Sequence, residues 1–169
     1  MPKKPSISIA MCLYEPNPAY LKEQLESIAS QTWLPDEMVV CDDSQCSSID
    51  LFQNWSKKTG VIVNYTLNNE PLGIVGNFSS ALSKTSFDYV LLSDQDDVWE
   101  PEKTQISVES IQEHEGEDLI PTLFHSDLSL IDGDSRETGS SFMKKQRIRG
   151  GEQDLLGTLM LHNVVTGCA

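Results

Sequence analysis

The chain has 169 residues, of which 38% are hydrophobic and 22% are charged, and 12 basic against 26 acidic residues give a net charge of −14. This length and apolar content predict one compact domain and exclude a disordered chain. Because so acidic a surface repels phosphate groups, the charge argues against a nucleic-acid or membrane-surface role, and the basic cluster of Lys144, Lys145, Arg147 and Arg149 is too short to reverse it.

Short apolar runs alternate with helical patterns along most of the chain. The predicted strands, in chain order, are residues 7–13, 37–41, 61–67, 87–92, 119–124 and 128–131. The first two are nearly continuous apolar runs, which are typical of strands buried on both faces of a parallel sheet. Strands that alternate with helices form βαβ units, so we expect an α/β fold with a mainly parallel sheet.

Four helices are predicted between these strands. Asn17 and Pro18 begin the first, as N-cap and first helical residue. Ser47, with Asp50 three residues later, predicts a capping box for the second, which Gly60 ends. Apolar residues mark the other two: Val75, Phe78 and Leu82 in the third, and the inward-facing Ile106 and Ile111 in the fourth, which runs from Pro101 to about Glu115.

The C-terminal part of the chain, from residue 132 onward, has fewer predicted helices and strands. Residues 132–133 predict a turn, and residues 133–151, poor in apolar side chains, predict a mobile loop. Residues 1–169 are expected to form a single domain, truncated at its C-terminal end because residues 162–169 read as an unfinished element. No run approaches the roughly 18 apolar residues that a membrane span needs.

Four cysteines occur in the chain: Cys12, Cys41, Cys46 and Cys168. They lack the paired spacing of a zinc site and the density of a disulfide scaffold. We therefore expect small buried residues in a reduced, cytoplasmic protein. The inner face of the membrane is an alternative location for the full-length protein.

Acidic residues follow the predicted strands, at the edge where open α/β sheets bind their ligands. The strongest signal is Asp94-Gln95-Asp96-Asp97, because aspartates two residues apart can direct carboxylate oxygens at one Mg²⁺ or Mn²⁺ ion. Such a cation would hold a diphosphate. The alternative is a solvated acidic loop, but the apolar residues on both sides argue against it.

Three other segments are weaker signals. Asp42 and Asp43 could bind a pyrimidine base or a ribose, or could simply end a strand. Tyr14 and Glu15 could contact a base and a ribose, or form a plain turn. Gly73, in the segment that ends at Asn77, would let the backbone approach a ligand closely.

Together, these segments resemble family 2 glycosyltransferases. The resemblance includes Ser27-Ile28 with Gln31-Thr32, the strand ending in Asp42-Asp43-Ser44, the segment around Gly73, the D-Q-D-D motif and the late Thr166-Gly167-Cys168. It implies a GT-A fold, which is a Rossmann-like three-layer sandwich, a nucleotide-sugar donor, a divalent cation and inversion at the anomeric carbon. Asn77 and the D-Q-D-D form look most like the bacterial rhamnosyltransferase-like branch, which favours a dTDP-sugar over a UDP-sugar.

The resemblance also assigns roles to single residues. It implies that Asp42 or Asp43 binds the base, Glu15 the ribose and Asp94 the nucleotide side of the donor, with Tyr14, Gly73 and Asn77 in the same nucleotide-sugar site. It implies that Asp96, with Asp94, binds Mg²⁺ or Mn²⁺, and that Asp97 and Trp99 border the sugar and the acceptor. The expected acceptor is a glycan or lipid-linked glycan of cell-surface polysaccharide synthesis.

The catalytic base is the gap in this assignment. In the family it usually follows the Gly-Cys segment, which would place it beyond Ala169, and Asp127 is the weak substitute within the chain. Two alternatives therefore stay open. One is a haloacid-dehalogenase-like phosphatase that uses Asp94 as nucleophile and Asp96 as acid/base. The other is a non-catalytic module that binds a nucleotide-sugar.

Overall fold

The computed structural model describes residues 5–114 and 121–148. The chain divides into two compact units, one up to Thr122 and one from Leu123 onward.

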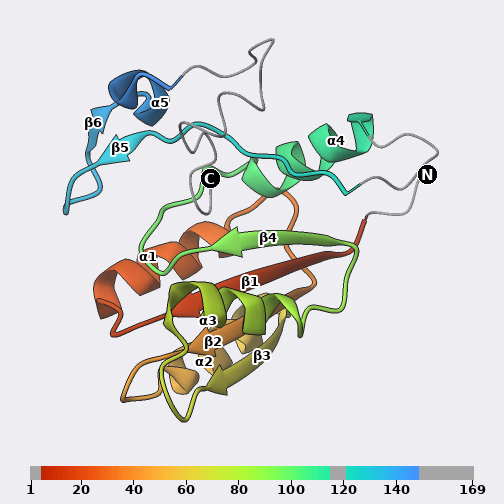
Figure 1. The fold of residues 1–169 in the computed structure, drawn as a ribbon, viewed down its shortest axis with the longest axis vertical. Helices are drawn as coiled ribbons and strands as arrows, with labels where there is room; N and C mark the ends of the chain where they lie inside the picture. Colours follow the sequence, from red (N-terminus) through yellow and green to blue (C-terminus); the bar gives the residue numbers. More distant parts are fainter. Residues whose placement is uncertain (1–4, 115–120, 149–169) are drawn as a thin grey trace. The chain divides into compact units, whose positions relative to one another are not determined.

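The first unit is built on a parallel sheet (Figure 1). Its strands are β1 (Ile7–Leu13), β2 (Glu37–Asp42), β3 (Ile62–Leu67) and β4 (Tyr89–Ser93), and they lie in the order β3-β2-β1-β4. Neighbouring strands pair in parallel, with Cys12 opposite Cys41 and Ile9 opposite Leu91. The predicted strands are thus confirmed to within a few residues, and all four end at the same edge of the sheet.

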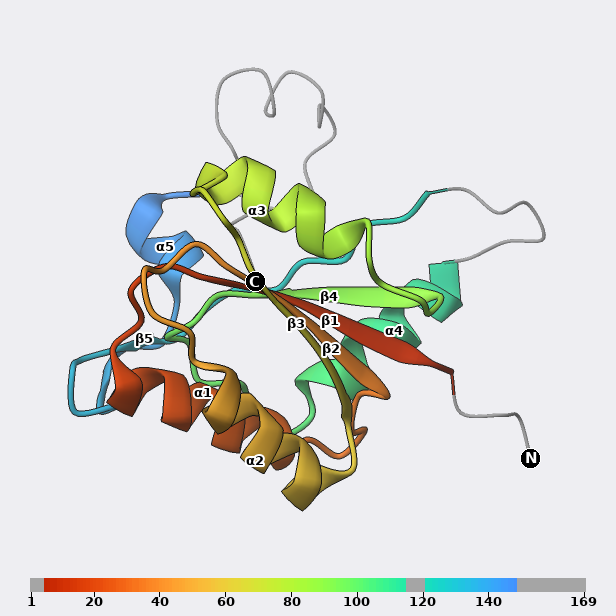
Figure 2. The same cartoon turned by 90° about the horizontal axis from the view of Figure 1, so that it is seen from below.

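Helices cover both faces of this sheet (Figure 2). They are α1 (Pro18–Ala29), α2 (Ile49–Thr59), α3 (Gly73–Leu82) and α4 (Lys103–His114). Apolar residues of α1, α2 and α4 join those of the strands in one buried cluster, whereas Ala81 of α3 packs in a second, smaller cluster on the other face. The result is the predicted three-layer α/β arrangement.

The helix ends match the sequence in part. Asn17 is the N-cap of α1, its side chain accepting a hydrogen bond from the Ala19 N–H at 2.9 Å, and Gly60 ends α2 in the left-handed region at φ 81°. The capping box predicted for α2 is wrong. Ser48 is the N-cap and makes no side-chain capping bond, while the Ser47 hydroxyl accepts from the Ile49 N–H instead.

Polar residues are buried in both α3 and α4. In α3 the buried residues are Asn77 and Ala81, and Val75 is 81% exposed. In α4 the buried residues are Thr104, Ser107 and Val108, so the inward orientation predicted for Ile106, which is 49% exposed, is wrong. Small and polar side chains thus make up all the buried residues of α3 and part of those of α4.

The second unit holds a hairpin and a short helix. Strands β5 (Leu130–Ile131) and β6 (Glu137–Gly139) pair antiparallel, and α5 (Phe142–Gln146) follows. The turn predicted at residues 132–133 is confirmed by the Ser135 N–H, which donates to the Asp132 carbonyl. The loop predicted for 133–151 is wrong where β6 and α5 form. The strand predicted at 128–131 is limited to Leu130–Ile131, and residues 121–124 form no strand, while 119–120 lie outside the described residues.

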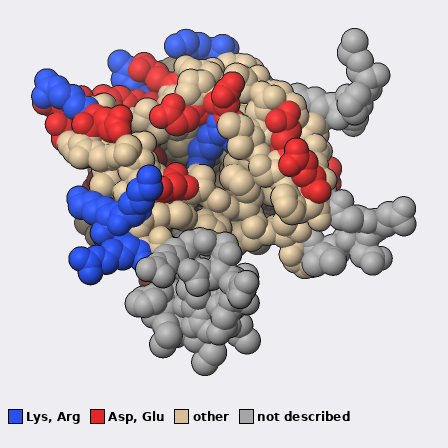
Figure 3. All heavy atoms as spheres, turned by 90° about the horizontal axis from the view of Figure 1, so that it is seen from above, with Lys and Arg blue, Asp and Glu red and all other residues tan. Residues whose placement is uncertain are grey.

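The acidic residues and the cysteines occupy both exposed and buried positions. Acidic side chains stand at several separate places on the face drawn in Figure 3, so much of the negative charge is spread over the surface. Cys41 is buried and Cys12 is half-buried, but Cys46 is exposed, contrary to prediction, and Cys168 lies outside the described residues. Within those residues, no helix is long and apolar enough to cross a bilayer.

Candidate functional site at the strand ends

The loops that follow β1 and β4 are joined by the side chain of Gln95. Its Oε1 accepts a hydrogen bond from the Tyr14 N–H at 2.8 Å, and its Nε2 donates to the Tyr14 carbonyl at 3.2 Å. β1 and β4 are neighbours in the sheet, so this pair of bonds continues their contact beyond the last strand residues. The acidic loop, residues 93–99, is thereby held beside Tyr14, whose ring is largely exposed.

The loop after β1 is also joined to the loop after β2. Glu15 adopts a left-handed backbone with φ 43°, which is uncommon for a residue other than glycine. Its N–H donates to the Ser44 hydroxyl at 2.8 Å, and its Oε1 accepts from the Gln45 N–H at 2.9 Å. These bonds hold the strained turn, so that three strand-end loops form one connected edge.

Asp42 is buried and takes part in hydrogen bonds of the protein itself. Its Oδ1 accepts from the Ser44 N–H at 2.8 Å, and its Oδ2 accepts from the Tyr65 hydroxyl. Burial, followed by this hydrogen bond to Asp42, raises the pKa of Tyr65 to about 12, so the phenol remains the donor. Asp42 therefore fixes the loop after β2 to β3.

Asp43 holds the start of α3. Its Oδ2 accepts from the N–H groups of Leu72 and Gly73, both at 3.0 Å, and its Oδ1 accepts from the Asn68 side chain at 2.7 Å. Gly73 has φ 70°, a conformation that glycine adopts without strain. A carboxylate at a helix N-terminus also interacts favourably with the helix dipole. Asp43 is thus a tertiary cap, with little of its surface exposed.

Asn77 is buried beneath this edge. Its Nδ2 lies 3.0 Å from the Cys41 carbonyl and 3.4 Å from the Leu13 carbonyl, and its Oδ1 accepts from Asn68 at 2.9 Å. One side chain thus connects the C-terminal ends of β1 and β2 to the loop after β3. The structure places Asn77 behind the edge rather than on its surface.

The acidic loop contains the remaining predicted residues. Asp94 and Asp97 are partly buried and Asp96 is exposed. Burial, followed by repulsion from Asp94 and then Asp96, raises the pKa of Asp97, while Lys103 lowers it. Asp94 and Asp96 therefore both act electrostatically on Asp97.

The donor chemistry of this loop fits a hard cation. Asp94 and Asp96 offer carboxylate oxygens, which Mg²⁺ and Mn²⁺ prefer. The described residues contain no group of three or more His, Cys, Asp or Glu side chains arranged to hold a metal ion. Since Mg²⁺ commonly takes one or two carboxylates and completes its shell with phosphate oxygens and water, two aspartates fit such a site.

Trp99 is only 4% exposed and belongs to the main core cluster. The Lys103 ammonium lies 5.4 Å from the centre of its ring, a cation–π contact. The ring thus anchors the end of the acidic loop in the core, and its predicted place beside the acceptor stays a prediction.

Asp127 belongs to the second unit, where its carboxylate accepts several hydrogen bonds. Its Oδ1 accepts from the N–H groups of Leu128 and Met143, at 2.8 and 2.9 Å, and its Oδ2 accepts from the Ser141 hydroxyl at 2.5 Å. These bonds, that of Ser141 first, lower the pKa of Asp127, which makes it a weaker base. The carboxylate holds the start of α5.

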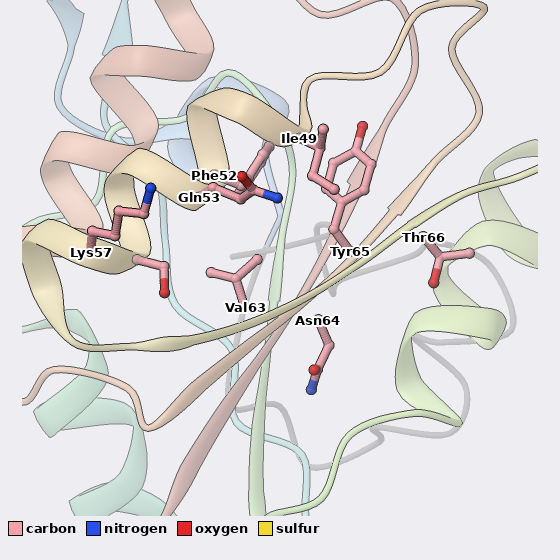
Figure 4. A pocket seen from close by; sticks show the side chains of 9 residues that line it. Ile49, Phe52, Gln53, Lys57, Val63, Asn64, Tyr65 and Thr66 are labelled. Carbon is pink, nitrogen blue, oxygen red and sulfur yellow. The ribbon is translucent and has the colours of Figure 1, made fainter.

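A cavity of about 490 Å³ lies elsewhere, between α2 and β3. Figure 4 shows Val63 and Tyr65 directed toward α2 in this cavity, with Phe52 and Lys57 opposite them. No carboxylate of the strand-end loops lines it, although the Tyr65 hydroxyl reaches Asp42. The cavity therefore lacks the carboxylates that would bind a divalent cation.

The family model described as glycosyl transferase family 2 matches residues 8–165 of this chain. The chain belongs to glycosyl transferase family 2. Its similarity to curated relatives is more limited: an uncharacterized protein of Sinorhizobium fredii is 28% identical over 142 residues, and the UDP-Gal:alpha-D-GlcNAc-diphosphoundecaprenol beta-1,3-galactosyltransferase of Escherichia coli is 32% identical over 98 residues. These alignments cover 78% and 56% of this chain but only 14% and 34% of the relatives.

Solved structures show the same fold. TarS of S. aureus matches with a TM-score of 0.55 at 25% identity, over 64% of this chain and 20% of TarS. The mannosyltransferase PcManGT of Pyrobaculum calidifontis, in complex with GDP-Man and Mn²⁺, matches with a TM-score of 0.53 at 20% identity, over 62% of this chain and 31% of that one. The predicted family and GT-A fold are confirmed, whereas the rhamnosyltransferase-like branch stays a prediction.

Sequence reasoning missed the uncharged residues that hold this edge together. Gln95, Asn68 and Tyr65 each join two loops or strands, yet none is acidic. The one available signal was the position of Gln95 within the acidic motif. The bonds to Tyr14, Asp43 and Asp42 span 81, 25 and 23 residues of the chain, so these pairings required the structure.

Proposed function

We propose that this chain binds a nucleoside-diphosphate sugar, dTDP- or UDP-linked, and transfers the sugar with inversion to an acceptor hydroxyl. The observation that carries the proposal is the Gln95–Tyr14 pair, which joins the acidic loop to the loop after β1 at the ends of adjacent parallel strands. Membership of the family supports it. The named activity of the Escherichia coli relative, which uses UDP-Gal, supports a nucleotide-sugar donor.

The donor would lie along the connected strand-end loops. Asp94 and Asp96 would hold Mg²⁺ or Mn²⁺, which when bound neutralises negative charge on the departing diphosphate. Glu15 and Asp96 are the exposed carboxylates here, and they suit contact with the ribose and with the cation. Asp42 and Asp43 would meet a base only with the oxygen lone pairs that their internal hydrogen bonds leave available.

The acceptor would be a glycan or lipid-linked glycan of cell-surface polysaccharide synthesis, used at the cytoplasmic face of the membrane. The Escherichia coli relative, whose printed name specifies a sugar on a diphosphoundecaprenol lipid, supports this choice. A carboxylate base would remove the acceptor's proton. Asp127 is a poor candidate for that base, because its oxygens already accept three hydrogen bonds within the second unit.

Calorimetry tests the binding step. UDP, dTDP and GDP are each titrated with and without Mn²⁺ or Mg²⁺, into the wild-type protein and into Asp96→Ala. The matched control is Asp88→Ala, which removes an exposed aspartate just before β4 rather than just after it. We expect metal-dependent binding of UDP or dTDP that Asp96→Ala weakens and Asp88→Ala leaves unchanged. If no nucleoside diphosphate binds with either metal, the proposal is wrong.

Activity assays separate the remaining alternatives. Sugar transfer, or hydrolysis of the donor in the absence of acceptor, is expected if the chain is catalytic, and binding without either reaction indicates a non-catalytic module. Release of phosphate from p-nitrophenyl phosphate, abolished in Asp94→Asn, would instead indicate a phosphatase.

A further inference from the structure

Helix α1 presents a polar face to the acidic loop. Gln24 and Ser27 lie three residues apart on the helix, and Gln31 follows shortly after its end. Gln24 and Gln31 are buried, which is unusual for glutamine. All three form hydrogen bonds with the segment that runs from Ser93 to Thr104, the segment that carries the acidic motif.

Gln24, with 0% of its side chain exposed, makes the central contacts. Its amide lies 2.6 Å from the Ser93 hydroxyl. The Asp97 carbonyl can only accept and the Trp99 indole N–H can only donate, so Nε2 faces Asp97 and Oε1 faces the indole nitrogen, 3.2 Å away. One amide therefore contacts the beginning, the middle and the end of the acidic loop.

Ser27 and Gln31 continue this support along the segment. The Ser27 hydroxyl accepts from the Trp99 backbone N–H at 3.0 Å. Gln31 donates from Nε2 to the Glu100 carbonyl at 2.8 Å and accepts at Oε1 from the Thr104 N–H at 3.0 Å. The loop is thus fixed through its backbone and its tryptophan.

These bonds do not use the carboxylates of Asp96 and Asp97. The α1 contacts reach the carbonyl of Asp97 rather than its carboxylate, and none of the described residues donates a hydrogen bond to the Asp96 carboxylate. Neighbouring carboxylates repel one another, so a loop that carries three of them needs anchors other than the acids themselves. Supporting groups of this kind typically affect metal affinity by about 10- to 100-fold.

We infer that Gln24 is a positioning residue, which, assisted by Ser27, holds the acidic loop in the arrangement that binds the metal–diphosphate. The inference rests on the proposed function of that loop. Gln24 itself does not contact the ligand and acts through Ser93, Asp97 and Trp99. Its loss is therefore expected to weaken the metal-dependent part of binding and to leave any metal-independent binding of the nucleotide unchanged.

The test compares wild-type protein with Gln24→Met, which preserves the side-chain length without the amide. Calorimetry measures UDP binding with and without Mn²⁺, and NMR follows the Trp99 indole N–H, assigned from Trp99→Phe. We expect the indole signal to shift and the Mn²⁺-dependent affinity to fall by about 10- to 100-fold. A shifted indole signal with unchanged affinity would overturn the inference, because Gln24 would then be merely structural.

A milder pair of variants covers the case in which Gln24→Met fails to fold. Ser27→Ala removes the acceptor for the Trp99 N–H, and Ser56→Ala removes a serine hydroxyl that donates from α2 to the Val61 carbonyl at 2.7 Å, away from the acidic loop. Only Ser27→Ala is expected to weaken Mn²⁺-dependent binding, and equal effects would refute the inference. If the wild-type protein itself binds no UDP with Mn²⁺, the proposed function fails and the inference fails with it.

Discussion

Replacing Gln95 by Met is expected to uncouple the acidic loop from the loop after β1. The substitution keeps the length of the side chain but removes both hydrogen bonds to the Tyr14 backbone, at 2.8 and 3.2 Å. Those bonds come from the solvent-exposed side of the edge, so their loss leaves the core intact. We therefore expect the variant to fold, with a specific defect in binding a ligand that contacts both loops.

The size of the defect follows from the two bonds. A neutral hydrogen bond contributes about 0.5–1.5 kcal/mol net, so the pair holds the loops together with about 1–3 kcal/mol. Each 1.4 kcal/mol is about a factor of ten in affinity, so the affinity for UDP with Mn²⁺ is expected to fall by about 5- to 150-fold. The upper value applies if the ligand requires both loops in their present positions.

Calorimetry with UDP and Mn²⁺ measures this effect directly. The matched control is Gln112→Met, which makes the same change at an exposed position of α4 and is expected to bind as the wild-type protein does. Thermal unfolding of both variants shows whether the fold is preserved. Equal affinity in Gln95→Met and Gln112→Met would refute the idea that Gln95 couples the two loops.

Three further predictions concern the residues that hold the fold. Asn77→Leu removes a donor to the buried Cys41 carbonyl and the acceptor for the Asn68 amide, and is expected to lower the free energy of unfolding in urea by about 2–4 kcal/mol, against about 0.5 kcal/mol or less for Asn54→Leu on the surface of α2. Because the pKa of Tyr65 is raised from 10.0 to about 12 in the fold, its contribution to stability is complete below pH 10 and is lost as the pH rises toward 12; Tyr65→Phe should lack this part of the alkaline loss in urea unfolding. Because the pKa of Asp127 is lowered from 3.8, its support of α5 is present above that pH and is lost as the pH falls below it; Asp127→Asn should speed amide exchange at Met143 near neutral pH, and unchanged exchange would contradict this.

The strands could be predicted because a strand buried on both faces consists of consecutive apolar residues. Residues 7–13 and 38–40 are apolar with hardly a break, since both faces of the parallel sheet are covered by helices. The helix termini at Asn17 and Gly60 could also be predicted, because a cap or a left-handed residue needs no partner from a distant part of the chain. Because the four strands are parallel, their carboxyl ends meet at one common edge of the sheet, where the candidate site lies.

The helix faces could not be predicted in the same way. Periodicity assigns the apolar positions to the core, but Thr104 of α4 is buried because its N–H and hydroxyl bond to Gln31 and the Trp33 carbonyl. In α3, Asn77 is buried because it satisfies carbonyls at the ends of two strands. In both helices hydrogen bonds to distant residues decided which face turned inward, and single-sequence patterns carry no information about such partners.

The acidic residues at the strand ends divide into two kinds, which the sequence could not distinguish. Asp42 and Asp43 are adjacent, so their side chains leave the chain on opposite sides, one toward Tyr65 and the other toward the start of α3. Both carboxylates therefore accept hydrogen bonds that hold the strand-end loops in place. Asp96 is exposed and receives no hydrogen bond from the described residues. Because the Asp96 side chain is exposed, we expect the proposed metal-dependent binding to depend on it more directly than on Asp42 or Asp43.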